Sequence, residues 1–280
     1  MEAALPTIAQ WLAKSRKALA AVSESPRLDA EVLLAQVLQQ DRGYLFTWPE
    51  RELSPPQFEQ AQGYLERRKT GEPVAYILGE REFWSLPLYC DASTLIPRPD
   101  TEVLVELVLA LLPENTQRIL DLGTGTGALA LALAYECKNC QVDAVDFSSS
   151  AVALAEKNRQ RLGLTNVRCM QSDWFSSAEG IYEVIVANPP YIDKQDSHLT
   201  QGDVAFEPRS ALVADDSGLA DLQRIIACAP KFLAEGGLLA LEHGYTQAPE
   251  VRDLFQRNGY KEVNTKKDYG GNDRVTYGFK

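Results

Sequence analysis

Cysteine and histidine are scarce in this chain of 280 residues, which has five cysteines and two histidines. An odd number of cysteines without a secretory signal argues against a disulfide framework. Cys137 and Cys140 form a single C-x-x-C pair. A structural zinc site needs four ligands, and no second pair is present in the sequence. We therefore expect free thiols and no metal centre.

Long apolar runs and an excess of basic residues are also missing. Glu106 interrupts the best apolar run, at 103–112, whereas a membrane-spanning helix needs roughly 18 or more apolar residues. The amino terminus lacks a basic-then-apolar signal. The net charge is −11, which opposes extensive contact with a phosphate backbone. We therefore expect a cytoplasmic protein that acts on a protein or small molecule, with no direct nucleic-acid or membrane partner.

The pattern of the chain changes twice, which indicates more than one domain. Residues 1–72 have apolar side chains at helical spacing, with helix starts at Ser25-Pro26 and Ser54-Pro55. Residues 73–96 are rich in β-branched and aromatic side chains, which is typical of strands. We predict an N-terminal helical domain at 1–72, a β connector at 73–96 and an α/β domain at 97–280.

The third region alternates apolar strands with helical stretches, and such alternation specifies a parallel sheet covered on both faces. The tail has two strand-like runs around a glycine-rich turn, so we expect a mostly parallel, Rossmann-like sheet with an antiparallel C-terminal strand. The expected strands are Arg118–Leu122, Gln141–Asp146, Val167–Gln171, 184–187, 238–242, 260–267 and 274–279, and the expected helices are Ala128–Glu136, Ser149–Leu162 and 219–233.

The most informative motif is Asn188-Pro189-Pro190-Tyr191, which follows the apolar run at 184–187. The carboxyl ends of the strands hold the substrate in an open α/β sheet. Asn offers a carbonyl acceptor beside a planar aromatic ring, and the prolines remove two backbone donors while leaving their carbonyls free. This arrangement suits a clamp for a planar NH2 group. The alternative is a proline-rich turn after a strand.

A glycine-rich loop with the sequence Asp-Leu-Gly-Thr-Gly-Thr-Gly lies at 121–127. Glycines after the first strand let a ligand approach the backbone closely. The spacing differs from the G-x-G-x-x-G dinucleotide fingerprint, which counts against an NAD-dependent enzyme. Asp146 ends the next strand, about 20 residues beyond the loop, where an acidic side chain accepts hydrogen bonds from ribose hydroxyls. An unrelated surface aspartate is the alternative.

A carboxylate beside aromatic residues follows the third strand, at 172–175. Asp173 suits the amino group of an adenine, and Trp174 or Phe147 suits the faces of its ring. The alternative is a capping aspartate with core aromatics.

The segment 97–102 leads into the helix that precedes the first strand. Thr101 and Glu102 either cap this helix or lie near a bound cofactor. His243 ends the fifth strand, and we interpret it as a structural residue.

Together these segments resemble the bacterial release-factor glutamine N5-methyltransferases, the PrmC/HemK family, over nearly the whole chain. The glycine loop and Asn-Pro-Pro-Tyr also occur in other methyltransferases. The family-level match therefore depends on the helical front, on Pro-Arg-Pro-Asp-Thr-Glu at 97–102 and on Glu-Phe-Trp-Ser-Leu-Pro at 82–87. The matching segments are 25–31, 81–88, 95–102, 121–127, 172–175, 188–193 and 268–274.

The resemblance implies a monomeric enzyme that uses S-adenosyl-L-methionine, releases S-adenosyl-L-homocysteine and supports translation termination. Its substrate is the glutamine of the Gly-Gly-Gln loop in class I peptide-release factors, which the helical domain recognises. The implied catalytic residues are Asn188, Pro189 and Tyr191, and Pro190 joins them in binding the substrate. The implied cofactor-binding residues are Gly123, Thr124, Gly125, Thr126, Gly127, Asp146, Asp173, Trp174 and Asn188.

Two other classes of protein share parts of this pattern. An RNA or DNA amino-methyltransferase uses the same motif on a flipped base, but the acidity of this chain counts against it, and so does the lack of a basic, aromatic-rich appendage. A non-catalytic module that binds adenosyl cofactors does not need Asn188 and Tyr191, and both are present.

Overall fold

The computed structural model describes residues 4–113 and 115–280, which form two compact units. The first unit contains the N-terminal residues up to Gly79 together with Thr200–Phe206. The second unit contains Glu80–Leu199 and Glu207–Lys280. No helix in the described ranges is both long and apolar enough to cross a membrane.

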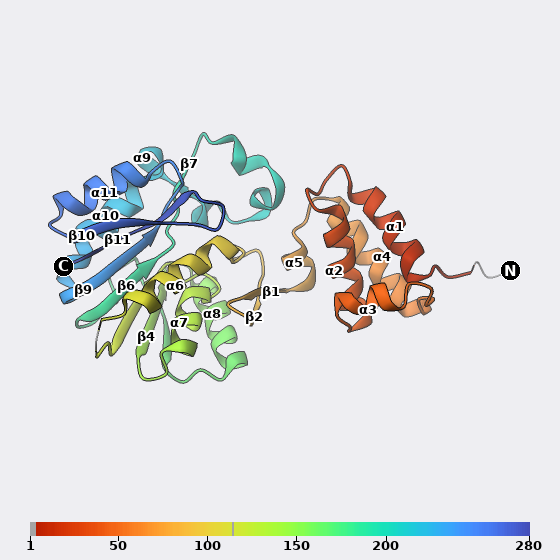
Figure 1. Cartoon of the computed structure of the whole chain (residues 1–280), viewed down its shortest axis with the longest axis horizontal. Helices are drawn as coiled ribbons and strands as arrows, with labels where there is room; N and C mark the ends of the chain where they lie inside the picture. Colours follow the sequence, from red (N-terminus) through yellow and green to blue (C-terminus); the bar gives the residue numbers. More distant parts are fainter. Residues whose placement is uncertain (1–3, 114) are drawn as a thin grey trace. The chain divides into compact units, whose positions relative to one another are not determined.

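The first unit is helical, and its helices pack around one apolar core (Figure 1). Trp11 and Leu65 are almost fully buried in this core. The predicted helix starts are confirmed, because Ser25 and Ser54 are the N-caps of two helices that begin with proline. The helices are α1 (Ile8–Leu19), α2 (Pro26–Leu38), α3 (Arg42–Thr47), α4 (Pro55–Lys69) and α5 (Val74–Leu78).

Helix α5 lies where β structure was expected, so that part of the prediction is wrong. Its β-branched and aromatic residues favour strands, but this preference depends on packing and is easily overridden. Pro73 precedes the helix, and Gly79 ends it with a left-handed φ of 75°. These residues are typical helix start and stop signals. Strand structure begins only at β1 (Glu80–Phe83), which pairs with β2 (Leu86–Tyr89).

The buried Arg68 ties the later segment Thr200–Phe206 to the helices of the first unit. Arg68 on α4 donates to Asp29 on α2, with Nε and Oδ2 2.7 Å apart. Its Nη1 also lies 3.3 Å from Oδ1 of Asp203. The charge of Arg68 is thus shared by residues from both ends of this unit.

The second unit is built on a seven-stranded sheet with the order β10-β11-β9-β6-β3-β4-β5. The central strands pair in parallel, and β11 runs antiparallel to both β9 and β10. The predicted fold class is therefore confirmed. The strands are β3 (Arg118–Leu122), β4 (Gln141–Asp146), β5 (Val167–Gln171), β6 (Tyr182–Ala187), β9 (Leu233–Glu242), β10 (Lys261–Lys267) and β11 (Asp273–Phe279).

The region before β9 differs from its prediction. The helix expected at 219–233 is shorter, because α10 (Ala220–Cys228) gives way to a 3-10 turn at Ala229–Lys231. Pro230 cannot donate within a continuing α-helix. The next strand then begins at Leu233, before the expected 238, and its register with β6 shifts between Leu233 and Leu238.

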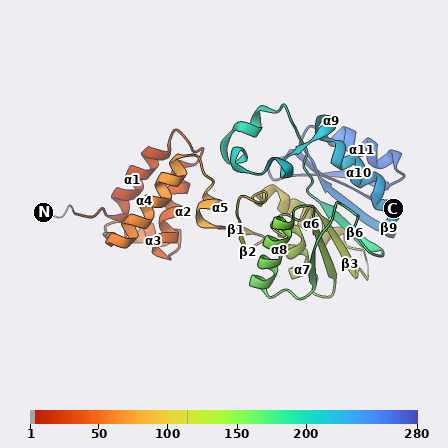
Figure 2. The same ribbon diagram turned by 180° about the vertical axis from the view of Figure 1, so that it is seen from behind.

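Helices cover both faces of the sheet (Figure 2). The remaining elements are α6 (Glu102–Leu111), α7 (Ala128–Glu136), α8 (Ser149–Leu162), α9 (Asp215–Gly218), α11 (Ala248–Arg257), β7 (Ile192–Asp193), β8 (Val213–Ala214) and 3-10 turns at Pro99–Thr101, Ser197–Thr200, Gly202–Phe206 and Arg209–Ala211. Successive strand residues point to opposite faces, so Ile119 packs with α6 and α7 while Leu120 packs with α10 and α11. Helix α8 contacts β4, β5 and β2.

Candidate active site

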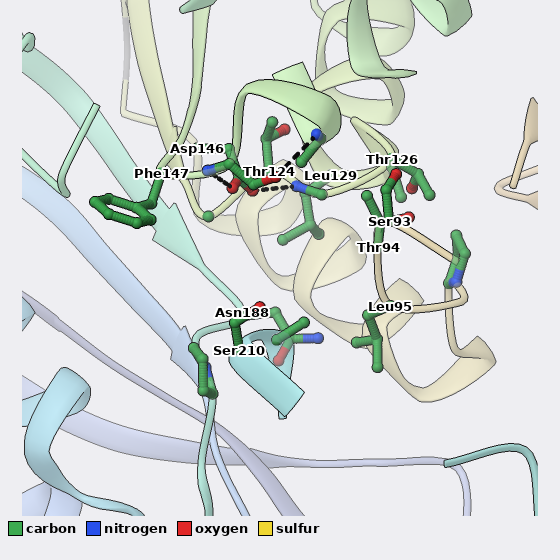
Figure 3. Close-up of a pocket in the computed structure, with 18 of the residues that line it drawn as sticks. Ser93, Thr94, Leu95, Thr124, Thr126, Leu129, Asp146, Phe147, Asn188 and Ser210 are labelled. Atoms are coloured by element: carbon green, nitrogen blue, oxygen red, sulfur yellow. Dashed lines mark hydrogen bonds between the residues drawn. The ribbon is translucent and has the colours of Figure 1, made fainter. Parts of the chain in front are cut away.

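A cavity of about 370 Å³ lies at the carboxyl edge of the sheet, within the second unit. Its volume is in the range of small-molecule sites. Figure 3 shows Thr124 and Asp146 on one side of the space and Asn188 and Ser210 on the other. The predicted site residues that line it are Gly123, Thr124, Gly125, Thr126, Asp146, Asp173, Trp174, Asn188 and Pro190.

The glycines of the loop after β3 have backbone angles that residues with a side chain rarely adopt. Gly123, Gly125 and Gly127 have φ values of 73°, 56° and 87°, which L residues rarely adopt. The amide of Gly123 donates to the carbonyl of Val145 at 2.8 Å. A Cβ on Gly127 would lie 2.9 Å from Leu131 Cδ1. The loop is therefore held against β4 and α7, although Gly127 itself is not among the residues that line the cavity.

Asp146 ends β4 and presents its carboxylate to the cavity. Its Oδ2 accepts from the amide of Gly125, and its Oδ1 accepts from the amide of Ser148, both at 2.9 Å (Figure 3). Burial raises the pKa of Asp146, and the two backbone hydrogen bonds oppose the rise. A carboxylate has about four lone-pair sites. Two bonds therefore leave capacity to accept from hydroxyl groups in the cavity.

Asp121 holds the same loop in place through hydrogen bonds. Its side chain is fully buried, and its Oδ2 accepts from Thr124 Oγ1 at 2.6 Å and from the amide of Ala130 at 3.2 Å. Its Oδ1 has no hydrogen-bond partner within the described ranges. Burial raises the pKa of Asp121 to about 7. This carboxyl group orders the loop and is not among the cavity-lining residues.

Asp173 and Trp174 line the cavity, as predicted for residues near an adenine, but Asp173 already has a partner. Its two oxygens accept from Arg224 at 2.8 and 2.9 Å. Trp174 has a left-handed φ of 49°. Its ring lies 3.5 Å from the position of a Cβ on Gly123. Phe147 also lines the cavity and is 74% exposed.

Asn188 follows β6 and lies on the cavity wall. One hydrogen bond fixes the orientation of its side-chain amide. The Nδ2 group donates to Thr101 Oγ1 at 3.3 Å. The opposite end of the amide, Oδ1, is the acceptor that the clamp interpretation requires. Pro190 also lines the cavity.

Pro189 and Tyr191 are not among the residues that line the cavity. The Tyr191 hydroxyl donates to Glu242 Oε1, at the end of β9, across 3.3 Å. Burial raises the pKa of Tyr191 above its usual range. The structure therefore directs this hydroxyl into the protein interior.

Thr101 occupies the N-cap position of α6, but its side chain makes no capping hydrogen bond, and it lines the cavity. Thr101 accepts from Asn188, and Glu102 Oε1 accepts from the amide of Trp84 at 2.8 Å. His243 is fully buried and hydrogen-bonds to Thr276 Oγ1 at 2.8 Å. This position agrees with a structural role.

Part of the cavity wall had no sequence signal. Ser210 and Ala211 reach it from the segment between β7 and β8, and Arg224 reaches it from α10. Arg98, which belongs to the 97–102 segment that the sequence had singled out, also lines the cavity, and its Nη2 donates to Glu207 Oε2 at 2.6 Å. These residues are far apart in the sequence and become neighbours only in the folded chain.

All five cysteines are free thiols. Cys140 Sγ lies 3.3 Å from the carbonyl of Thr116, and Cys137 and Cys140 are not in the cavity lining. Within the part of the chain that the structure describes, no group of three or more His, Cys, Asp or Glu residues is arranged to hold a metal ion.

The parallel sheet, the glycine loop, the acidic end of β4 and the Asn-Pro-Pro-Tyr segment define a class I methyltransferase. Residues 10–79 match the PrmC N-terminal domain and residues 100–208 match the Methyltransferase small domain. The release factor glutamine methyltransferase of Salmonella typhimurium is 57% identical over 257 residues, which cover 91% of this chain and 93% of that protein. The chain belongs to the release factor glutamine methyltransferase family, which confirms the recognition made from the sequence.

Other comparisons agree with this assignment. The release factor glutamine methyltransferase of Escherichia coli (strain K12) is 53% identical over 269 residues, which cover 96% of this chain and 97% of that protein. A solved methyltransferase from Pyrococcus furiosus aligns with a TM-score of 0.53 at 20% identity. The alignment covers 79% of this chain and 98% of the solved chain, and it shows a shared fold.

Replacing Gly127 by Ala should destabilise the second unit more than replacing Gly163 by Ala. Both glycines have positive φ, so each substitution has a backbone cost of about 1–2 kcal/mol. Only Gly127 meets other atoms, since a Cβ on Gly163 has nothing within 4 Å. Overpacking adds roughly 1–3 kcal/mol. The free energy of unfolding measured in urea checks this, and equal losses would contradict the close approach to Leu131.

Proposed function

We propose that this chain transfers a methyl group from S-adenosyl-L-methionine to the side-chain N5 of a glutamine. We further propose that this glutamine belongs to the Gly-Gly-Gln motif of class I peptide chain release factors, so that the enzyme supports translation termination. The observation that carries the proposal is an Asn-Pro-Pro-Tyr segment whose Asn188 lines the cavity, in a chain 53% identical to the release factor glutamine methyltransferase of Escherichia coli over 96% of its length.

The cavity fits an adenosyl cofactor. The loop at 123–127 has no bulky side chain at its glycines, Asp146 has acceptor capacity for two ribose hydroxyls, and Trp174 offers a flat ring. Asp173 is assigned to the adenine amino group, and it shares its carboxylate with Arg224. When bound, the cofactor supplies an electrophilic methyl group on its sulfonium. A cavity of about 370 Å³ accommodates a ligand of this class.

The chemical difficulty is the nucleophile, because the lone pair of an amide nitrogen is delocalised. The amide rotation barrier of about 18–20 kcal/mol measures this resonance, so complete loss of conjugation is too costly. We infer that Asn188 Oδ1 and the Pro189 carbonyl each accept one N–H of the substrate amide. These bonds strengthen as the nitrogen becomes positive, to about 1.5–3 kcal/mol each. They therefore stabilise the transition state more than the ground state.

The remaining steps need no strong base. The methylated and protonated amide is very acidic and loses its proton to water. Tyr191 is assigned to orient the plane of the substrate amide, and its hydroxyl bond to Glu242 holds the ring in place.

The helical unit is proposed to recognise the release factor. Two large aromatic side chains on and next to α3 are exposed, with Phe46 at 53% and Trp48 at 57%. Exposed aromatic residues are enriched among the side chains that dominate protein interfaces. A role in partner recognition accounts for their position on the surface.

Replacing Asp146 by Asn should weaken S-adenosylhomocysteine binding at least about tenfold, because charged hydrogen bonds contribute about 1.5–3 kcal/mol each. Burial raises the pKa of Asp146, so the protein with Asp146 should lose affinity as the pH falls towards this raised value. The Asn variant should not. Calorimetry on the folded variant checks both expectations, and unchanged affinity would remove Asp146 from the cofactor site.

Replacing Asn188 by Ala should lower single-turnover methylation far more than cofactor affinity. The lost hydrogen bond acts mainly as charge develops on the nitrogen. Rapid-quench assays at saturating cofactor measure the methylation rate. A variant that retains a near wild-type rate would rule out the clamp.

Replacing Phe46 and Trp48 together by Ser should raise KM for the intact release factor. A short peptide that contains Gly-Gly-Gln should be methylated as before, because it lacks the remainder of the partner surface. Steady-state kinetics with both substrates separate the two cases. An unchanged KM for the intact factor would assign recognition to another surface.

The function itself is tested with purified release factor and methyl-labelled cofactor. Mass spectrometry should place one added methyl group on the glutamine of the Gly-Gly-Gln loop, and changing that Gln to Glu should abolish it, because Glu has no NH2. The net charge of −11 opposes phosphate contacts, so binding should lack a steep salt dependence. Methylation of purified RNA or DNA, with none of the release factor, would favour a nucleobase methyltransferase.

A further inference from the structure

One glutamine side chain joins three backbone segments that are far apart in the sequence. Gln247 directly precedes α11. Its Oε1 accepts from the amide of Gly244 at 2.8 Å. Its Nε2 donates to the carbonyl of Tyr191 at 3.1 Å and to the carbonyl of Ser217 at 3.2 Å. Both hydrogens of this NH2 group therefore have a partner, and one of them holds the last residue of the Asn-Pro-Pro-Tyr segment.

These contacts require an amide at position 247. Two of the three partners are carbonyl oxygens, which accept, and the third is an N–H, which donates. A glutamate carboxylate has nearly the same shape but only accepts, so it would face two carbonyls without a hydrogen between them. An amide turned by 180° would meet an unsuitable partner at both ends. The surroundings therefore fix both the residue type and the orientation of the side chain.

The turn that contains Ser217 is strained and approaches the same Tyr191 carbonyl. Asp216 and Ser217 have left-handed φ values of 55° and 54°, and Gly218 has a φ of 82°. Such angles are unfavourable for residues with a side chain and persist where surrounding contacts hold them. A Cβ on Gly218 would lie 2.1 Å from the Tyr191 carbonyl oxygen. The turn belongs to α9, which lies beside β7 (Figure 1).

The two prolines extend the effect of this contact to Pro189. A proline has no N–H, so residues 189 and 190 cannot be held through their own backbone donors. Their rings also fix φ, which leaves few free torsions between the Pro189 carbonyl and the Tyr191 carbonyl. A shift at Tyr191 is therefore passed on to the Pro189 carbonyl, the second acceptor of the proposed clamp. The Tyr191 ring has its own anchor in the hydroxyl bond to Glu242.

We propose that Gln247 is a positioning residue for methyl transfer, which fixes the backbone of Tyr191 and thereby keeps the Pro189 carbonyl at the reacting amide. The inference rests on the proposed function, in which the Asn-Pro-Pro-Tyr segment binds the substrate amide. Gln247 is not among the residues that line the cavity. It therefore acts through this segment and touches neither substrate nor cofactor.

A second glutamine bonds to the same turn and provides a matched control. Gln223 on α10 donates from Nε2 to Asp216 Oδ2 at 2.7 Å. In the described part of the chain, Gln223 has no hydrogen bond to Tyr191. Replacing Gln223 thus removes a side-chain donor from the turn and leaves the Tyr191 carbonyl with its partner.

The test measures kcat and KM with purified release factor, and S-adenosylhomocysteine binding by calorimetry, which also gives the fraction of binding-competent protein. Gln247→Leu removes all three hydrogen bonds, and Gln247→Glu removes only the two donors. Gln223→Leu is the control for the glutamines. Gly218→Ala forces the turn away from the Tyr191 carbonyl. Its control is Gly259→Ala, since Gly259 has a φ of 84° and a Cβ there has nothing within 4 Å.

Gln247→Leu and Gly218→Ala should lower kcat per binding-competent molecule about 10- to 100-fold, as misplacement of a catalytic group does, with KM and cofactor affinity little changed. Gln223→Leu and Gly259→Ala should keep kcat close to wild type. Gln247→Glu should be slow at neutral pH. Its kcat relative to wild type should recover as the pH falls towards about 5, because a protonated carboxyl group can again donate to the Tyr191 carbonyl.

The proposal is overturned if Gln247→Leu loses only stability and keeps wild-type kcat, if Gln223→Leu is as slow as Gln247→Leu, or if cofactor affinity falls together with kcat. It is also overturned if Gln247→Glu shows no recovery at low pH, or if Gly259→Ala is as slow as Gly218→Ala. If Gln247→Leu or Gly218→Ala does not fold, the pH dependence of Gln247→Glu decides. Failure of the proposed function has a different signature, because the wild-type protein would then leave the release factor unmethylated.

Discussion

Parallel pairing of the central strands is the constraint on which the site depends. Leu122 pairs with Val145 on one side and with Ala187 on the other, and Ala187 pairs with Leu241. The glycine loop, Asp146, Asn188 and Glu242 follow these positions, so all of them emerge at the same edge of the sheet. A slip of one residue would turn each strand's side chains to the opposite face. The buried residues on both faces exclude such a slip.

The site also depends on two carboxyl groups buried beneath it. Asp121 orders the glycine loop and Glu242 accepts from the Tyr191 hydroxyl, and burial raises the pKa of each to about 7. Each group has one oxygen without a hydrogen-bond partner in the described ranges. The hydrogen bonds that these groups do make hold the glycine loop and the Tyr191 ring in place.

The segment after the Asn-Pro-Pro-Tyr motif contributes residues to both units. Thr200–Phe206 belongs to the helical unit, where Asp203 meets Arg68. The chain then enters the second unit at Glu207, which accepts from the amide of Ile96 and from Arg98. One continuous stretch thus connects the unit proposed to grip the partner with a wall of the cavity.

The sequence by itself determined most of the strands and helices of the α/β unit and named many of the residues that line the cavity, because helix and strand periodicity and the glycine loop are local signals. Strands such as Arg118–Leu122 and Gln141–Asp146 were predicted with their observed bounds. Helix α5 was missed, because β propensity depends on packing that local pattern does not contain. The tertiary structure alone decided that Asn188 bonds to Thr101, that Ser210 and Arg224 form part of the cavity wall, and that Tyr191 bonds to Glu242. These contacts join residues far apart in the chain, and they follow from strand register and loop closure, which short-range sequence patterns do not encode.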